Sequence, residues 1–293
     1  MTKITKAVIA AAGFGTRFLP ATKVVPKEML PLIDRPIVQH LVEEAVASGI
    51  KEVILVVRPG TRMIEDHFGN GFLLENHLKN QGKKELLGEL KKIGKMAKIS
   101  VCYQDEKLPY GTGAPLASVA GRIKKGEYFV FMFGDDLVKS KIPAAKQLIK
   151  LWQKDKKAVI LGCQEIPLEK VIHFGMVGLK KGTKNRVEKF VEKPQPEKTP
   201  SRLGSFGRFV LNREIIEILL KQQNQAGKKR EFLLTDAIAA YAKEKKVLAK
   251  KVEGQWFTTG DPLNWLKANI EFALEKEEIR DELTCYLKTL KLR

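Results

Sequence analysis

The hydrophobic residues of this chain fall into short continuous runs that alternate with longer amphipathic stretches. The runs are rich in β-branched and aromatic residues and predict buried strands at residues 7–12, 53–57, 99–103, 128–133 and 158–163. Residues 36–47 and 142–152 instead carry apolar side chains at helical spacing. Pro36 suits the first turn of the earlier helix, and Gly49 falls just beyond its end.

The alternation of strand-like and helix-like segments predicts the fold class. We expect an α/β fold with a Rossmann-like, mostly parallel mixed sheet and helices on both of its faces. Residues 69–96 interrupt the pattern as a Lys- and Glu-rich helical insertion. Shorter pieces at residues 175–179 and 187–192 predict a small β-rich part. The pattern therefore indicates a main domain over residues 1–261, followed by terminal helices over residues 262–293.

The composition is that of a soluble globular protein. Of the 293 residues, 44% are hydrophobic and 30% are charged. No apolar run approaches the ~20 residues that span a bilayer, and the N-terminus lacks a signal-peptide core, so no membrane partner is expected. Cys102, Cys163 and Cys285 are too widely spaced for a zinc motif and odd in number for a disulfide framework. Reduced thiols in the cytoplasm are the simplest interpretation.

The net charge of +19 raises the question of a nucleic-acid partner. The lysines are spread along the chain in pairs, mostly beside acidic residues, and aromatic residues for base stacking are not interleaved with them. A solvated surface that also attracts small anionic substrates explains this charge better. We therefore expect no nucleic acid as the main partner.

A glycine-rich turn follows the first predicted strand directly. Residues 13–17 read Gly-Phe-Gly-Thr-Arg, and glycines there let the backbone approach a ligand so that its N–H groups meet phosphate oxygens. Arg17, Lys23 and Lys27 add positive charge around the same position, with Glu28 as the one acid. The combination indicates a nucleoside triphosphate that is cradled by amides and clamped by cations.

Other glycine-rich motifs fit this segment poorly. A dinucleotide-binding fingerprint needs a third glycine where Phe18 stands, and the Gly-Lys-Ser/Thr of a P-loop is missing. The simplest alternative is an ordinary strand-to-helix turn that happens to contain glycine. The full run GxGTRxLPATKxxPKEMLP is much longer than either motif. It resembles the signature of bacterial UTP–glucose-1-phosphate uridylyltransferases, within the sugar-1-phosphate nucleotidyltransferase family.

This resemblance extends from about residue 4 to about residue 275 and implies an activity. It implies the transfer of a uridylyl group from UTP to glucose-1-phosphate, giving UDP-glucose and pyrophosphate. Residues 1–261 would form the catalytic domain, and residues 262–293 would join subunits in a homodimer or homotetramer. Two alternatives remain open. One is a catalytically weak paralogue that binds a nucleotide or sugar nucleotide, and the other is a transferase for another nucleotide or sugar phosphate.

Gln104 ends the third predicted strand, and a Gly111-Thr112-Gly113 turn follows it. A glutamine amide offers a donor and an acceptor that match the N3–H and O4 edge of uracil. On the residues alone, a polar strand end and a turn would be the simpler interpretation. The resemblance implies that the nucleotide is bound by Ala12, Gly13, Gly15, Thr16, Glu28, Gln104 and Gly111.

Asp135 follows a predicted strand within Gly134-Asp135-Asp136. A carboxylate at a strand end opposite a phosphate loop suits Mg²⁺, which is held by one or two carboxylates together with substrate phosphates. The alternative is a helix cap or an Asx-turn, and Asp136 is the weaker metal candidate. The resemblance would place a second metal-binding acid where Thr258 stands. Asp261 precedes Pro262 and a helical pattern, which indicates a helix N-cap.

The sugar-phosphate side of the resemblance lies in two further motifs. It assigns Gly175 and Glu192 to glucose hydroxyls and Lys193 to the glucose-1-phosphate phosphate, for which a compact ammonium is well suited. On its own, Glu-Lys-Pro would be a solvated loop. Further along, Thr235 and Asp236 can be explained as caps of the helix that follows. The expected catalytic residues are Arg17, Lys27 and Lys193.

Overall fold

A nine-stranded mixed sheet forms the centre of the computed structural model, which describes residues 3–225 and 231–290. The strand order is β10-β9-β11-β6-β1-β4-β5, with β8 beside β11 and β12 beside β8. The strands are β1 Lys6–Ala11, β4 Glu52–Val57, β5 Lys98–Tyr103, β6 Tyr128–Phe133, β8 Val159–Glu165, β9 Gly175–Leu179, β10 Val187–Glu192, β11 Leu203–Asn212 and β12 Val247–Lys251. All five strands expected from the apolar runs are present, within two residues of their predicted ends.

The predicted parallel arrangement holds for β6, β1, β4 and β5, which run side by side in the same direction. Because both faces of these strands are covered, their residues are continuously apolar rather than alternating. Strand β11 runs antiparallel to both β6 and β8 and joins this set to the smaller β-rich part. The carboxyl ends of β1, β4, β5 and β6 therefore meet at one edge of the sheet.

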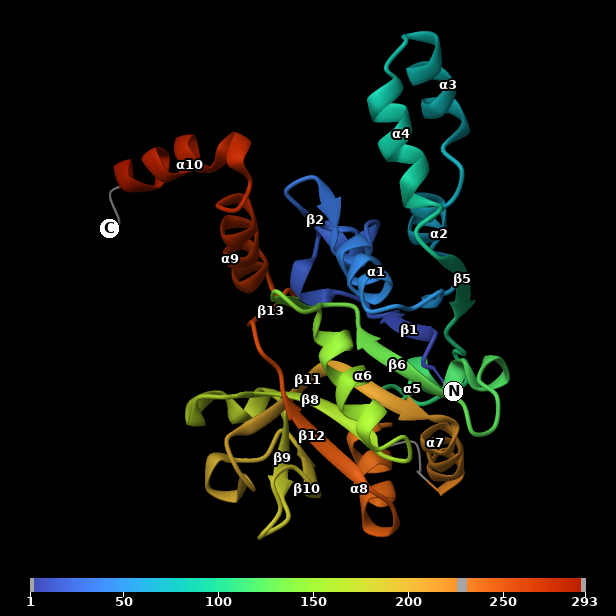
Figure 1. Ribbon diagram of the computed structural model, residues 1–293, viewed down its shortest axis with the longest axis vertical. Helices are drawn as coiled ribbons and strands as arrows, with labels where there is room; N and C mark the ends of the chain where they lie inside the picture. Colours follow the sequence, from blue (N-terminus) through green and yellow to red (C-terminus); the bar gives the residue numbers. More distant parts are fainter. Residues whose placement is uncertain (1–2, 226–230, 291–293) are drawn as a thin grey trace.

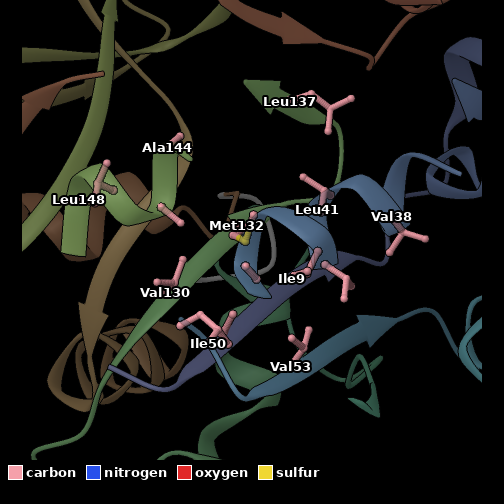
Figure 2. Close-up of a cluster of buried hydrophobic side chains, with 14 of the residues drawn as sticks. Ile9, Val38, Leu41, Ile50, Val53, Val130, Met132, Leu137, Ala144 and Leu148 are labelled. Carbon is pink, nitrogen blue, oxygen red and sulfur yellow. The ribbon is translucent and has the colours of Figure 1, made fainter. Parts of the chain in front are cut away.

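Helices cover the sheet on both faces, as predicted. One face packs on α1 Ile37–Ala47 and α6 Ala144–Lys154, and the other on α5 Ala114–Ser118, α7 Arg213–Gln225 and α8 Leu234–Glu244. Alternate strand residues supply the two cores: Ile9 points to the first and Val8 to the second. Figure 2 shows the first core, with Ile9, Val53, Val130 and Met132 from the strands and Val38, Leu41, Ala144 and Leu148 from the helices.

The start of α1 differs from the sequence prediction. Pro36 lies in a two-residue strand, β3 Arg35–Pro36, which pairs with β2 Pro31–Leu32, and the helix begins only at Ile37. The extended backbone of Pro36 therefore makes it the residue before the helix rather than its first turn. Gly49 follows the helix with a φ of 93°, as its predicted position near the helix end implies.

Two helical segments extend from the body of the molecule (Figure 1). Within residues 69–96 the chain forms α3 Phe72–Asn80 and α4 Lys84–Ile93, which follow α2 Met63–Phe68 and project away from the sheet. Near the end of the chain are α9 Pro262–Ala273 and α10 Glu277–Thr289, while residues 291–293 of the predicted terminal segment lie outside the described range. Within the described residues, no helix has the length and apolar character that a bilayer crossing requires.

Candidate active site

The glycine turn leaves the carboxyl end of β1 and is held in one conformation by its neighbours. Gly15 has a φ of 63°, in the left-handed region where a side chain is strained. The hydroxyl of Thr22 donates a hydrogen bond to the Gly15 carbonyl at 2.7 Å, and a Cβ added at Gly15 would lie 3.1 Å from the Thr22 methyl. Thr22 therefore packs closely against Gly15, and the absence of a side chain at Gly15 lets a ligand approach the backbone there.

Lys27 and Asp135 meet at this edge of the sheet, although they are 108 positions apart in the chain. Lys27 Nζ lies 2.6 Å from Asp135 Oδ2, and about a quarter of the Asp135 side chain is exposed. Burial favours the neutral form of Asp135, but the nearby Lys27 charge outweighs it and holds the pKa of the carboxyl below its usual value. Burial likewise opposes the charge of Lys27, yet Asp135 and Glu28 raise its pKa. Both groups are therefore charged at neutral pH.

A small two-stranded antiparallel sheet fixes the backbone of Asp135. Strand β13 Gln255–Thr258 runs antiparallel to β7 Asp136–Lys139, with Thr258 opposite Asp136. The next residue, Thr259, is fully buried and donates to the Asp135 carbonyl through its N–H at 2.6 Å and its hydroxyl at 3.0 Å. A Cβ added at Gly260 would lie 3.1 Å from Asp135 Oδ2 and 3.6 Å from the Thr258 hydroxyl. The Thr258 hydroxyl and the Asp135 carboxylate thus flank the same point.

Asp136 borders the site, but both of its carboxylate oxygens are bound by other groups of the protein. Its Oδ1 accepts a hydrogen bond from the Trp256 indole N–H at 2.7 Å, and its Oδ2 accepts one from the Gly207 N–H at 3.0 Å. Burial and the adjacent Asp135 charge raise the pKa of Asp136 to about 7. With both oxygens engaged by the protein, Asp136 serves as an anchor for the turn, so Asp135 is left as the carboxylate that can reach a ligand.

A buried arginine, Arg208, binds the backbone of the Asp135–Asp136 turn. The sequence analysis did not single it out. The guanidinium of Arg208 is fully buried on β11 and donates to both oxygens of Glu44 on α1, at 2.7–3.2 Å. It also donates to the Asp136 carbonyl at 2.6 Å and to the Gly207 carbonyl at 2.8 Å. Arg208 therefore ties the Asp135–Asp136 turn to the helix layer.

Glu192 and Lys193 lie at the end of β10, beside Gly175 at the start of β9. Lys193 has a φ of 43°, which is unusual for a residue with a side chain, and its N–H donates to the Phe174 carbonyl at 3.0 Å. Its ammonium is half exposed and lies 3.7 Å from Glu192 Oε1. Strained conformations of this kind gather at functional sites, which agrees with the sugar-phosphate role predicted for Lys193.

The interpretation of Thr235 and Asp236 as helix caps is wrong. Helix α8 begins at Leu234, so both residues lie inside its first turn. The Leu234 N–H is instead capped by the hydroxyl of Thr112 at 3.1 Å. The Thr235 hydroxyl donates to Glu192 Oε2, an interaction that only the folded chain brings together.

One large cleft joins Arg17 and Asp135 to the predicted sugar-phosphate residues, whereas the other predicted residues of the glycine turn and its surroundings are not part of its lining: Ala12, Gly13, Gly15, Thr16, Lys27 and Glu28. Its volume is about 1,280 Å³, and its lining includes Arg17, Asp135, Gly175, Glu192 and Lys193. Phe174, Phe206 and Trp256 line the same cleft as an aromatic wall, with Trp256 stacked on Phe206 at a centroid distance of 5.4 Å.

The residues predicted to face the base lie further along the sheet. Gln104 follows β5, which is separated from β1 by β4, and its N–H donates to the Val57 carbonyl at 2.8 Å. Gly111 packs directly against the backbone of Phe232, beside the cleft residue Thr112. The structure therefore does not place Gln104 or Gly111 in the walls of the described cleft, and their role in base recognition stays a prediction.

Comparison with known proteins identifies the family of this chain. The model of the nucleotidyl transferase family matches residues 6–274. The chain belongs to this family. UTP–glucose-1-phosphate uridylyltransferase 2 from Staphylococcus saprophyticus is 42% identical over 294 residues, which cover 100% of both chains. This transferase also resembles two solved structures from Acinetobacter baumannii at 31% identity, each covering 98% of this chain and 100% of the other. They are a UDP-glucose pyrophosphorylase, with a TM-score of 0.88, and a UTP-bound UGPase, with a TM-score of 0.87.

Nucleotidyl transferases of this kind generally use a divalent metal, and the residues at Asp135 fit one. Among the described residues of this transferase, no group of three or more His, Cys, Asp or Glu side chains is arranged so that it could hold a metal ion by itself. Asp135 offers a carboxylate and Thr258 a hydroxyl, which are oxygen donors of the kind that hard cations prefer. Asp261 is engaged elsewhere: as predicted, it caps α9, accepting from the Asn264 N–H at 3.0 Å with Pro262 as the first helical residue. The protein therefore fits a metal whose remaining ligands are substrate phosphates.

Proposed function

We propose that this protein transfers a uridylyl group from UTP to glucose-1-phosphate, releasing pyrophosphate and forming UDP-glucose. The observation that carries the proposal is the large cleft, which joins Arg17 of the glycine turn and Asp135 to Glu192 and Lys193. The names and bound nucleotide of its relatives support the same substrates. Two anionic reactants must meet in this reaction, so positioning and charge neutralisation are the main tasks of the site.

The residues divide these tasks according to their place in the cleft. Lys193, half exposed beside Glu192, would hold the phosphate of glucose-1-phosphate, while Glu192 and Gly175 face the sugar hydroxyls. Arg17 lies at the opposite side, where its guanidinium reaches the Gly260 carbonyl at 3.5 Å. Together with Lys27, it would neutralise the triphosphate and the departing pyrophosphate. No covalent enzyme intermediate is needed, because the sugar phosphate attacks the α-phosphate directly.

We propose Mg²⁺ as the metal, with Asp135 as its protein carboxylate and Thr258 beside it. When bound, magnesium would neutralise and orient the phosphates. Lys27 Nζ already contacts Asp135 at 2.6 Å. Lys27 would therefore shift toward the phosphates as Asp135 takes up its role in metal binding.

The function is tested by incubating the purified protein with glucose-1-phosphate, magnesium and each of UTP, CTP, dTTP and ATP while pyrophosphate release is followed. The expected result is release that depends on both UTP and glucose-1-phosphate. Replacement of glucose-1-phosphate by galactose-1-phosphate or mannose-1-phosphate tests the sugar. Binding of UTP without pyrophosphate release under any combination would contradict the proposal and indicate a nucleotide-binding protein instead.

We also propose that the protein acts in the cytoplasm as a homodimer or homotetramer joined through its C-terminal helices. Helix α10 has no buried residue, and its apolar side chains Ile279 and Tyr286 are exposed, as is Leu290 directly after it. An apolar helix face of this kind is stabilised when a partner covers it. Light scattering at micromolar concentration should give a dimer or tetramer mass, and a monomer mass would refute the assembly.

A further inference from the structure

Arg58 stands between the two parts of the sheet edge from which nucleotide contacts are predicted. Strand β4 lies between β1 and β5, with Ala11 opposite Val57 and Val57 opposite Tyr103. The residues that follow these strands are Ala12, Arg58 and Gln104. Arg58 is therefore flanked by the start of the glycine turn on one side and by the predicted base-reading glutamine on the other.

The side chain of Arg58 packs against the glycine turn itself. Its guanidinium carbon lies 4.8 Å from the centre of the Phe14 ring, within the range of a cation–π contact. Phe14 is 59% exposed and belongs to the turn between Gly13 and Gly15. A stacked guanidinium uses only its flat face, so the N–H groups at its edge stay free to donate hydrogen bonds. Within residues 3–225 and 231–290, the Arg58 side chain forms no hydrogen bond or ion pair with the protein.

A buried carboxyl behind the turn also feels the charge of Arg58. The side chain of Glu28 is 1% exposed, and its Oε2 has no hydrogen-bond partner among the described residues. Burial raises the pKa of Glu28 to about 7, and the positive charges of Lys27 and Arg58 act in the opposite direction. The positive charge of Arg58 thus acts on Glu28, a residue that the sequence analysis assigned to the nucleotide.

We propose that Arg58 is a base-reading residue that donates to a uracil carbonyl oxygen, and that Phe14 positions it by stacking. The inference rests on the proposed function, because it deepens the choice of UTP as the substrate. Uracil presents an acceptor at O4, whereas cytosine presents an amino donor at the same place. The N–H groups of a guanidinium can donate to the O4 acceptor of uracil, but they find only another donor in the amino group of cytosine. Arg58 therefore contributes to the preference for UTP over CTP.

The test is the affinity of the full-length protein for magnesium-UTP and magnesium-CTP, measured by calorimetry. Arg58→Met keeps much of the side-chain length and removes the donors. It should weaken UTP binding about ten-fold, the order expected when a hydrogen bond to a charged donor is lost. CTP binding should change little, so that the UTP/CTP ratio falls by the same factor. Phe14→Ala should lower the ratio in part, and Phe14→Tyr, which retains an aromatic ring, should preserve it.

Arg62→Met is the matched control, because Arg62 is an exposed arginine four residues further on, at the start of α2. It should leave both affinities unchanged. Equal weakening of UTP and CTP by Arg58→Met would overturn the proposal, because it would indicate a contact with the phosphates. The absence of any change in either affinity would overturn it as well. If the unmodified protein binds UTP but makes no UDP-glucose, the proposed function fails, and the base-reading role of Arg58 is still decided by the same titration.

Discussion

The buried pair of Glu44 and Arg208 allows a prediction that separates stability from activity. Arg208 is fully buried, and the Glu44 side chain is 9% exposed, with three hydrogen bonds between them. The substitution Glu44→Gln removes the negative charge and leaves the guanidinium buried without its counter-charge. Breaking a buried ion pair from one side costs about 3–5 kcal/mol.

This free energy translates into a measurable melting temperature. The entropy of unfolding is about 2.1 cal/mol/K per residue, or roughly 0.6 kcal/mol/K for a chain of this length. Glu44→Gln should therefore lower Tm by about 5–8 °C in differential scanning calorimetry. The control is Glu217→Gln, which removes the partner of Arg213 in a partly exposed pair of 3.5 Å on α7. Exposed pairs contribute about 0.2–1 kcal/mol, so the control should lower Tm by less than about 2 °C.

The double variant Glu44→Leu with Arg208→Met should recover at least half of the lost Tm, because an apolar pair replaces two buried charges. It should still turn over more slowly than the unmodified protein, by about ten-fold for a loss of 1.4 kcal/mol in transition-state stabilisation. The reason is that Arg208 also donates to the carbonyls of Asp136 and Gly207, next to the ligand-facing Asp135. A Tm loss for Glu44→Gln no larger than that of the control would refute the reasoning, as would full recovery of turnover in the double variant.

Three further predictions concern the cleft. Thr258→Asp adds a carboxylate beside Asp135 and should tighten Mn²⁺ binding in the presence of UTP, measured by calorimetry, and raise turnover by order ten-fold; an unchanged metal affinity would contradict this. Lys193→Ala should weaken glucose-1-phosphate far more than UTP, and Arg17→Ala should do the reverse, whereas equal effects on both substrates would exclude the proposed division. The folded state raises the pKa of Glu28 from 4.5 to about 7, so between these values it holds a proton that the unfolded chain has lost. Glu28 should therefore lower stability by roughly 3 kcal/mol as pH rises through this window. In denaturant titrations Glu28→Gln should remove this contribution and leave the decline that Asp136, whose pKa is also raised to about 7, adds in the same range.

The sequence predicted those features whose cause is local. Continuous apolar runs such as residues 53–57 identify strands because both faces of the sheet are covered. The N-cap at Asp261 is encoded by its own residue and by Pro262. The prediction put Pro36 in the first turn of the helix, whereas it lies in a two-residue strand that pairs with Pro31–Leu32. The helical spacing of apolar residues carries no information about this pairing.

The parts of the site that the sequence left out are contacts between distant segments. Glu44 and Arg208 are separated by 164 positions, and Asp136 and Trp256 by 120. Neither pair belongs to a motif, and the identity of a residue as arginine does not indicate whether its side chain is buried or solvated. The Thr235 hydroxyl was assigned to a cap because its bond to Glu192 depends on where β10 ends beside α8. Motifs thus indicated the groups that we expect to face a ligand, and folding supplied the groups that hold them in place.

The pairing of β13 with β7 also determines when the site is completed during synthesis. The Asp135–Asp136 turn emerges in the first half of the chain, but Trp256 and Thr259, which bind its carboxylate and its carbonyl, are made near the end. A chain released before Trp256 would contain the glycine turn and the sugar-side residues, yet Asp135, the proposed metal ligand, would lack the contacts that hold its turn in place. Premature termination late in the message therefore yields an incomplete site rather than a partly active transferase.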